Sequence, residues 1–148
     1  MDVSTVAGYG LAAGYLLLCS ISDIRTRSVP ARLLFSGVAG GAAFRVALLL
    51  LGKSPLMELP VLLLPGLGLL ILAWISHEIG EGDGIAWIGL GEFLGPDVLM
   101  TGMITLFLTF LWGAFLMLRK KAGRKFRIPF LPFSLAGLVI RILFRYLE

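Results

Sequence analysis

Two acidic residues beside long apolar runs are the side chains of this chain best suited to chemistry. Asp23 follows the apolar run 4–21, and Asp83 stands sixty residues further along, directly before the run 84–95. An ionisable group near membrane hydrocarbon is costly, so it is usually paired or functional. Two carboxylates held close together cannot easily both ionise, and such a pair shares one proton. One member can then activate water while the other polarises a scissile carbonyl, which is the chemistry of an aspartyl peptidase.

The residues just before Asp83 suit an active-site loop. They form the stretch Gly80-Glu81-Gly82-Asp83. Gly80 and Gly82 lack side chains, so the backbone can turn tightly there and a substrate strand can approach closely. Glu78 and Glu81 are acidic residues beside the same stretch and compete with the two aspartates for a catalytic role.

Spacing alone leaves structural roles open for both aspartates. Asp83 could cap the N-terminus of a helix, where its side chain would satisfy free backbone amides. Asp23 could pair with Arg25 or Arg27 at the membrane interface. These alternatives predict no shared location for the two carboxylates, whereas the catalytic interpretation requires one.

Composition predicts a membrane protein. Hydrophobic residues make up 58% of the 148 residues and charged residues 15%, against about 45–50% and about 25% in soluble domains. The apolar segments cover residues 4–21, 32–51, 57–76, 84–95, 98–118 and 129–147. A membrane-spanning helix needs about 20 residues, so the segment 84–95 is short. We predict an all-α polytopic fold of six transmembrane helices, the fourth short, forming a single domain over residues 1–148.

The net charge of +4 reports topology. The basic residues cluster at residues 25–32 and 119–127, beside apolar segments. Basic loops stay cytoplasmic, so both clusters lie inside, the fourth segment spans, and both termini lie outside. This arrangement puts Asp23 and Asp83 together at the cytoplasmic boundary. It also gives no reason to expect a nucleic-acid partner.

Other polar residues in or beside the apolar segments are assigned structural roles. Cys19 and His77 are the only cysteine and the only histidine, so we expect no metal site and no cofactor. Arg45 is expected to snorkel to the outer interface. Glu92 lies half a turn round the helix from Asp83 and is expected to pair with another helix or reach the outer interface.

Three stretches, residues 23–30, 80–95 and 128–137, together resemble the type IV prepilin peptidase family, a group of GxGD-type intramembrane aspartyl proteases. They occur in the family's order and spacing, and the resemblance covers essentially the whole chain. It implies that Asp23 and Asp83 are the catalytic pair. The chain departs from the family pattern at Ala31 and Ile85, where asparagine and lysine are common. It also lacks the cysteine-rich segment of larger members, which implies a minimal form that is only a peptidase.

The resemblance further implies a reaction and a location. The expected reaction removes a short basic leader from a prepilin or pseudopilin at the cytoplasmic face of a prokaryotic inner membrane, using water and no metal. The negative charge of Glu78 and Glu81 would attract such a leader, which makes them candidate substrate-binding residues. The lipid bilayer and the precursor are the expected partners, and the sequence indicates no oligomeric state. Two alternatives remain open: a non-catalytic membrane scaffold for pilin-like proteins, and a small ion-coupled transporter. Such carriers often contain internal repeats, and this chain shows none.

Overall fold

The computed structural model describes residues 2–77, 80–119 and 128–147, and in these residues it contains helices and no strand. The helices are α1 (Val3–Thr26), α2 (Ala31–Leu50), a 3-10 turn η1 (Leu56–Glu58), α3 (Leu59–Ser76), α4 (Glu81–Leu94), α5 (Asp97–Leu118) and α6 (Phe130–Leu147). All six predicted helices are present in the predicted order. The all-α prediction is therefore confirmed.

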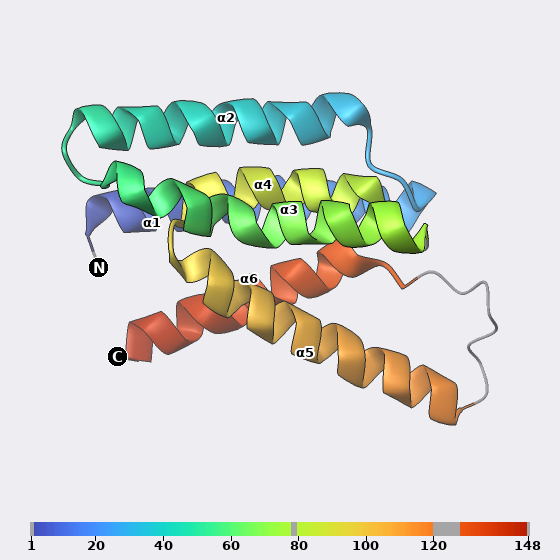
Figure 1. The fold of residues 1–148 in the computed structure, drawn as a ribbon. Coiled ribbons are helices and arrows are strands. Elements are labelled where there is room, and N and C mark those ends of the chain that lie inside the picture. The colour runs from blue at the N-terminus through green and yellow to red at the C-terminus, as the bar shows by residue number, and fades with distance from the viewer. Residues whose placement is uncertain (1, 78–79, 120–127, 148) are drawn as a thin grey trace.

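Successive helices run in opposite directions (Figure 1). The ends of α1, α3 and α5 and the beginnings of α2, α4 and α6 therefore lie at one end of the bundle, which we call the site end. The two chain termini lie at the opposite end, which we call the far end. Five of the six helices, all except α4, are long and apolar enough to cross a membrane. The chain is a multi-pass membrane protein.

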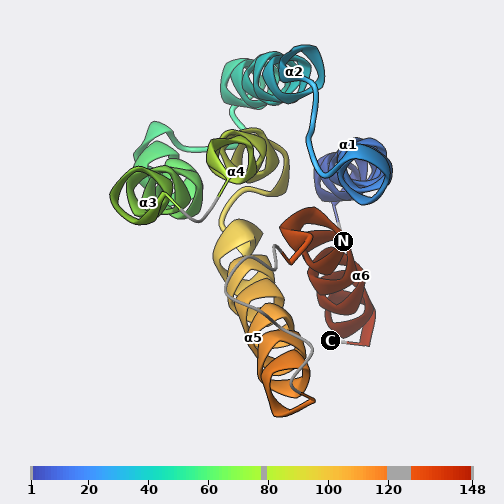
Figure 2. The ribbon, with the colours of Figure 1, turned by 90° about the vertical axis from the view of Figure 1, so that its right-hand side faces the viewer.

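The short helix α4 occupies the centre of the bundle, with α1, α2, α3 and α5 around it (Figure 2). Nine of its 14 residues are buried. Glycines allow this close packing: a Cβ at Gly84 would lie 2.6 Å from Leu70 of α3, and one at Gly89 would lie 2.9 Å from the Gly37 backbone of α2. Because protein rather than lipid surrounds α4, its backbone need not match the bilayer thickness.

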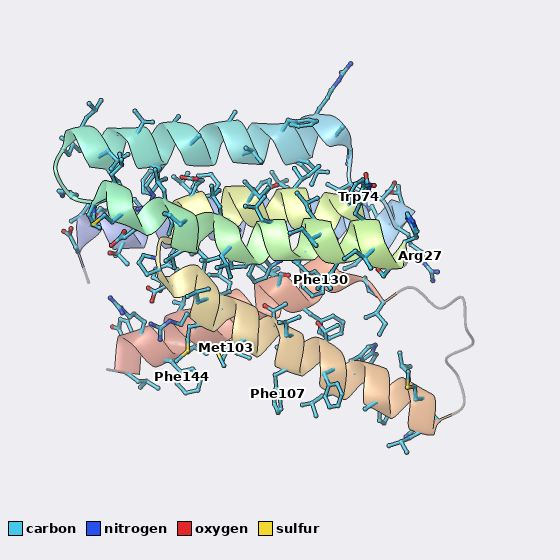
Figure 3. The ribbon with its side chains drawn as sticks, in the orientation of Figure 1. Arg27, Trp74, Met103, Phe107, Phe130 and Phe144 are labelled. Atoms are coloured by element: carbon cyan, nitrogen blue, oxygen red, sulfur yellow. The ribbon has the colours of Figure 1, made fainter. Side chains whose placement is uncertain are left out.

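The outer surfaces of the bundle are apolar. Trp74 of α3 and Phe107 of α5 are 76% and 62% exposed, and Figure 3 shows Met103, Phe107 and Phe144 on the outer sides of α5 and α6. The buried residues of α5 all belong to its first nine positions. Its second half diverges from α3 and α4 toward the site end (Figure 1). Lipid is the natural solvent for these faces.

Arg45 corrects one prediction from the sequence. Its side chain does not snorkel outward, because the residue is only 5% exposed. The guanidinium turns into the bundle, where Nη1 donates to Ser54 Oγ at 2.8 Å. It also lies 3.9 Å from carboxylate oxygens of Glu58 and of the buried Glu92. The expected pairing of Glu92 with another helix is thus confirmed, with α2 as that helix.

Candidate active site

Asp23 lies inside the last turn of α1. The helix extends to Thr26, five residues beyond the apolar run predicted to form it. It ends at Arg27, whose backbone is left-handed (φ 51°) and whose N–H donates to the Asp23 carbonyl at 2.8 Å. The hydroxyls of Ser22 and Thr26 donate to the Ser28 carbonyl at 3.1 and 2.8 Å. These local hydrogen bonds fix the turn that follows the aspartate.

The Asp23 carboxylate faces the N-terminus of α6. It interacts with the backbone N–H of Leu131, the second residue of that helix. The first N–H groups of a helix have no partner within it and carry partial positive charge, so they stabilise an anion. Oδ2 of Asp23 is buried and has no hydrogen-bond partner among the described residues. In that same part of the chain, Asp23 forms no ion pair with the exposed Arg25 or Arg27.

Asp83 lies in the first turn of α4, which begins at Glu81, three residues before the predicted start. Its N–H donates to the Gly80 carbonyl at 3.0 Å. Gly80 precedes the helix with ordinary extended backbone, so its expected role in a tight turn is not met by a special conformation. Both glycines instead leave room beside a neighbouring side chain. A Cβ would lie 3.6 Å from Asp83 Oδ2 at Gly80, and 3.3 Å from Leu34 at Gly82.

The start of α6 lies between the helix that carries Asp83 and the side chain of Asp23. Trp87 follows Asp83 by four residues and therefore shares its face of α4. Its indole Nε1 donates to Ser134 Oγ of α6 at 3.1 Å. Ser134 stands one turn beyond Leu131, whose N–H faces Asp23. The beginning of α6 thus connects the helix of Asp83 with the side chain of Asp23.

The surrounding helix ends agree with this arrangement. Figure 3 shows Arg27 at the end of α1, Trp74 near the end of α3 and Phe130 at the start of α6, all at the site end. Because the helix directions alternate, Asp23 near the end of α1 and Asp83 near the start of α4 lie at the same end of the bundle, as predicted (Figure 1).

Of the two glutamates predicted to bind substrate, Glu81 is among the residues that the structure describes. Glu81 is exposed and lines a cavity of about 270 Å³ with Leu70, Ile71 and Trp74 of α3. It precedes Asp83 by two residues, and side chains so spaced do not share a helix face. Glu81 therefore lies at the rim of the site end rather than beside Asp83. Glu78 lies outside the described residues.

Ser134 and Trp87 were not predicted from the sequence to belong to the site. The only signal was the motif at residues 128–137, which contributed to a resemblance but carried no assigned role. Both residues are almost completely buried, with exposures of 0% and 1%. A buried serine that contacts a buried indole leaves no trace in hydropathy, because both occur in ordinary apolar helices.

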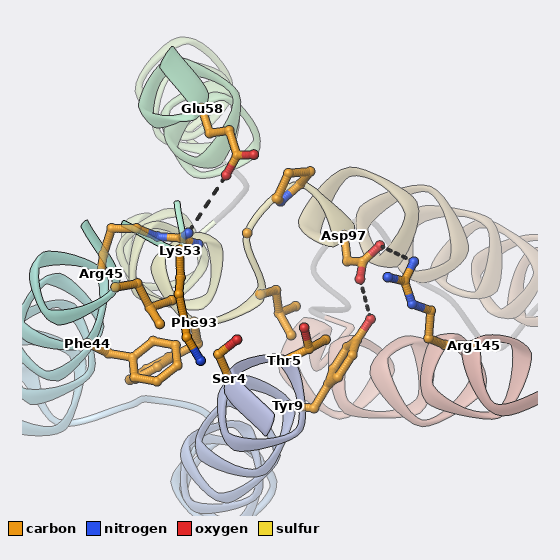
Figure 4. Close-up of a pocket in the computed structure, with 14 residues that line it drawn as sticks. Ser4, Thr5, Tyr9, Phe44, Arg45, Lys53, Glu58, Phe93, Asp97 and Arg145 are labelled. Atoms are coloured by element: carbon orange, nitrogen blue, oxygen red, sulfur yellow. Dashed lines mark hydrogen bonds and ion pairs between the residues drawn. The ribbon is translucent and has the colours of Figure 1, made fainter. Parts of the chain in front are cut away.

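A second polar region lies at the far end and contains none of the predicted site residues. A cavity of about 290 Å³ separates the Arg45 cluster from a second cluster around Asp97 (Figure 4). Asp97 accepts hydrogen bonds from the Tyr9 hydroxyl at 2.5 Å and from Arg141 Nη2 at 2.7 Å. Arg145 lies 3.8 Å from it. These contacts join α1, α5 and α6 at the end opposite the two aspartates.

Comparison with known proteins identifies one family. Residues 10–118 match the type IV leader peptidase family, a stretch that includes Asp23 and Asp83 and stops before α6. No curated protein and no solved structure matches the chain.

Proposed function

The chain belongs to the type IV leader peptidase family, and from this premise we propose that it is a membrane aspartyl endopeptidase whose catalytic pair is Asp23 and Asp83. The observation that carries the proposal is that Asp23, in the last turn of α1, and Asp83, in the first turn of α4, lie at the same end of the bundle (Figure 1). The buried, unpartnered Oδ2 of Asp23 supports it. Most buried polar atoms have a hydrogen-bond partner within the fold, so an unpartnered carboxylate oxygen suits a group that binds water or substrate.

The reaction requires only the two carboxyl groups and water. The ionised carboxylate takes a proton from water as the water oxygen attacks the scissile carbonyl carbon. The protonated partner donates its proton to the carbonyl oxygen. When the tetrahedral intermediate collapses, the second carboxylate takes a proton from one of its hydroxyls, the C–N bond breaks, and the amine leaves with a proton from the first carboxyl. The two groups then share one proton again.

The substrate we propose is a prepilin or pilin-like precursor with a short basic leader before an apolar helix. Glu81 at the rim of the site end adds negative charge that attracts such a leader. The basic stretches at residues 25–32 and 119–127 favour a cytoplasmic orientation for this end. The corresponding membrane is the inner membrane of a prokaryote, with both termini outside.

The test is cleavage of a candidate precursor by aspartate variants. Asp23→Asn and Asp83→Asn should each abolish leader removal, read by mass spectrometry after co-expression, because one carboxyl group cannot perform both steps. Each loss should be at least about 10²–10⁴-fold, as for the removal of a general acid or base. The matched control is Glu81→Gln, a neutralised carboxylate of the same helical turn, which should keep turnover and weaken only the binding of the basic leader.

Two outcomes would contradict the proposal. Full cleavage by either asparagine variant would exclude the acid pair. Binding of the precursor by the purified wild-type protein without any cleavage would favour the scaffold alternative instead.

A further inference from the structure

Trp87 and Ser134 form a buried polar contact between α4 and α6. The indole Nε1–H donates to Ser134 Oγ at 3.1 Å, and the hydroxyl donates onward to the Phe130 carbonyl at 3.3 Å. The Trp87 and Phe130 rings also lie 6.1 Å apart with a 42° interplanar angle. A hydrogen bond is directional, unlike apolar packing. This one therefore fixes how far α4 is rotated about its axis relative to the start of α6.

The indole has little freedom to move. A Cβ at Gly102 of α5 would lie only 3.2 Å from its six-membered ring, so α5 packs directly against it. Trp87 is 1% exposed, and Ser134 is fully buried. In a buried site the loss of one partner leaves the other without a hydrogen bond, which is costly. The contact is thus both rigid and hard to replace.

Each side of the contact leads to one aspartate through a single helical turn. On α4, Asp83 stands four residues before Trp87. On α6, which packs against α1, Leu131 stands three residues before Ser134, and its backbone N–H is within interaction range of the Asp23 carboxylate. We infer that the Trp87–Ser134 hydrogen bond is a positioning contact that sets the relative placement of the Asp23 and Asp83 carboxyl groups. The expected effect of this contact on kcat rests on the proposed function, whereas its expected effect on the separation of the two carboxyl groups does not.

The geometric test measures the separation of positions 23 and 83 without using activity. Cysteines replace both aspartates in a Cys19→Ala background, and bifunctional maleimides of graded length are applied to the full-length protein in detergent. Ser134→Ala should shift the reagent length that cross-links most efficiently, and Trp87→Phe should do the same. The double variant should match the singles, because either change alone removes the whole contact.

The kinetic test uses the intact aspartates. Ser134→Ala and Trp87→Phe should lower kcat on the order of 10²-fold with KM little changed, the typical effect of displacing a catalytic group by about 1 Å. A reaction that needs the singly protonated pair gives kcat a bell-shaped dependence on pH, whose width reports the coupling between the two carboxyl groups. In both variants this bell should narrow. A role limited to stability would alter neither the width nor the cross-linking length.

The matched control is Thr101→Val. Thr101 is fully buried on α5, and its hydroxyl donates only within its own helix, to the Asp97 carbonyl at 2.9 Å. This variant should keep the wild-type cross-linking length and pH profile. If Ser134→Ala and Trp87→Phe also keep both, the positioning role is wrong. If cross-linking shifts as expected but Asp23→Asn still cleaves, the positioning role stands and the proposed function fails.

Discussion

Two glycines of α3 offer a sharp test of how α4 is held. Gly66 faces α4, where an added Cβ would lie 2.6 Å from the Ile88 backbone nitrogen and 3.0 Å from the Gly84 carbonyl oxygen. Ordinary contact begins at 3.4 Å, so Gly66→Ala must move α3 and α4 apart by about 0.8 Å. Overpacking of this kind costs about 1–3 kcal/mol. Alanine recovers up to about 1 kcal/mol through its helix propensity, so we expect a net loss of about 1–2 kcal/mol.

The same displacement should reach the proposed catalytic pair. Gly84 directly follows Asp83, so a shift of this turn moves the carboxyl group by a similar distance. Misplacement by about 1 Å lowers catalytic rates on the order of 10²-fold. The assay pairs the kcat of leader removal in detergent with the free energy of unfolding from titration with denaturing detergent.

Gly68→Ala is the matched control on the same helix. A Cβ at Gly68 has nothing within 4 Å. Its replacement should therefore leave kcat unchanged and stabilise the protein by up to about 1 kcal/mol. Equal stability and equal kcat for Gly66→Ala and Gly68→Ala would refute the conclusion that close α3–α4 packing positions Asp83.

Two further predictions concern topology and the far end. In a Cys19→Ala background, a cysteine at Lys53 should react with an impermeant thiol reagent from outside, and one at Arg119 only after permeabilisation; outside reactivity at Arg119 would mean that α4 does not cross. Arg141→Met should destabilise the protein by about 1–3 kcal/mol, because the half-buried Asp97 carboxylate loses its 2.7 Å partner and keeps only Tyr9 and Arg145 among the described residues. The exposed ion pair between Lys53 and Asp2 should contribute less than about 1 kcal/mol in the same unfolding assay. Equal destabilisation on removal of Lys53 and of Arg141 would contradict this account.

The sequence predicted the helices well because hydropathy reports where lipid or protein interior must replace water. It predicted their ends less well. The first apolar run stops at residue 21, yet α1 continues to Thr26, since a polar segment at the membrane boundary can keep its helical hydrogen bonds. At α4 the start moves from residue 84 to Glu81, which puts Asp83 inside the helix. Both aspartates consequently have directions fixed by helical turns rather than by loops.

Contacts between helices distant in sequence could not be predicted. Arg45 turns inward because Glu58 and Glu92 come from other elements of the fold, and no periodicity in its own helix announces them. The Trp87–Ser134 contact joins residues 47 positions apart. The family match likewise stops at residue 118, before α6. The role of the first turn of α6 therefore comes only from the structure.

Among the described residues, the carboxylates of the far end lie beside buried guanidinium groups, whereas Asp23 at the site end does not. This difference suits a member of an acid pair. At the far end, the buried cations Arg45 and Arg141 lie within 4 Å of carboxylates. At the site end, Arg25 and Arg27 are exposed. Asp23 instead faces a helix N-terminus, which carries only partial charge. A guanidinium held against Asp23 would favour its ionised form, whereas the partial charges of a helix N-terminus can orient this carboxyl group and still allow it to share a proton.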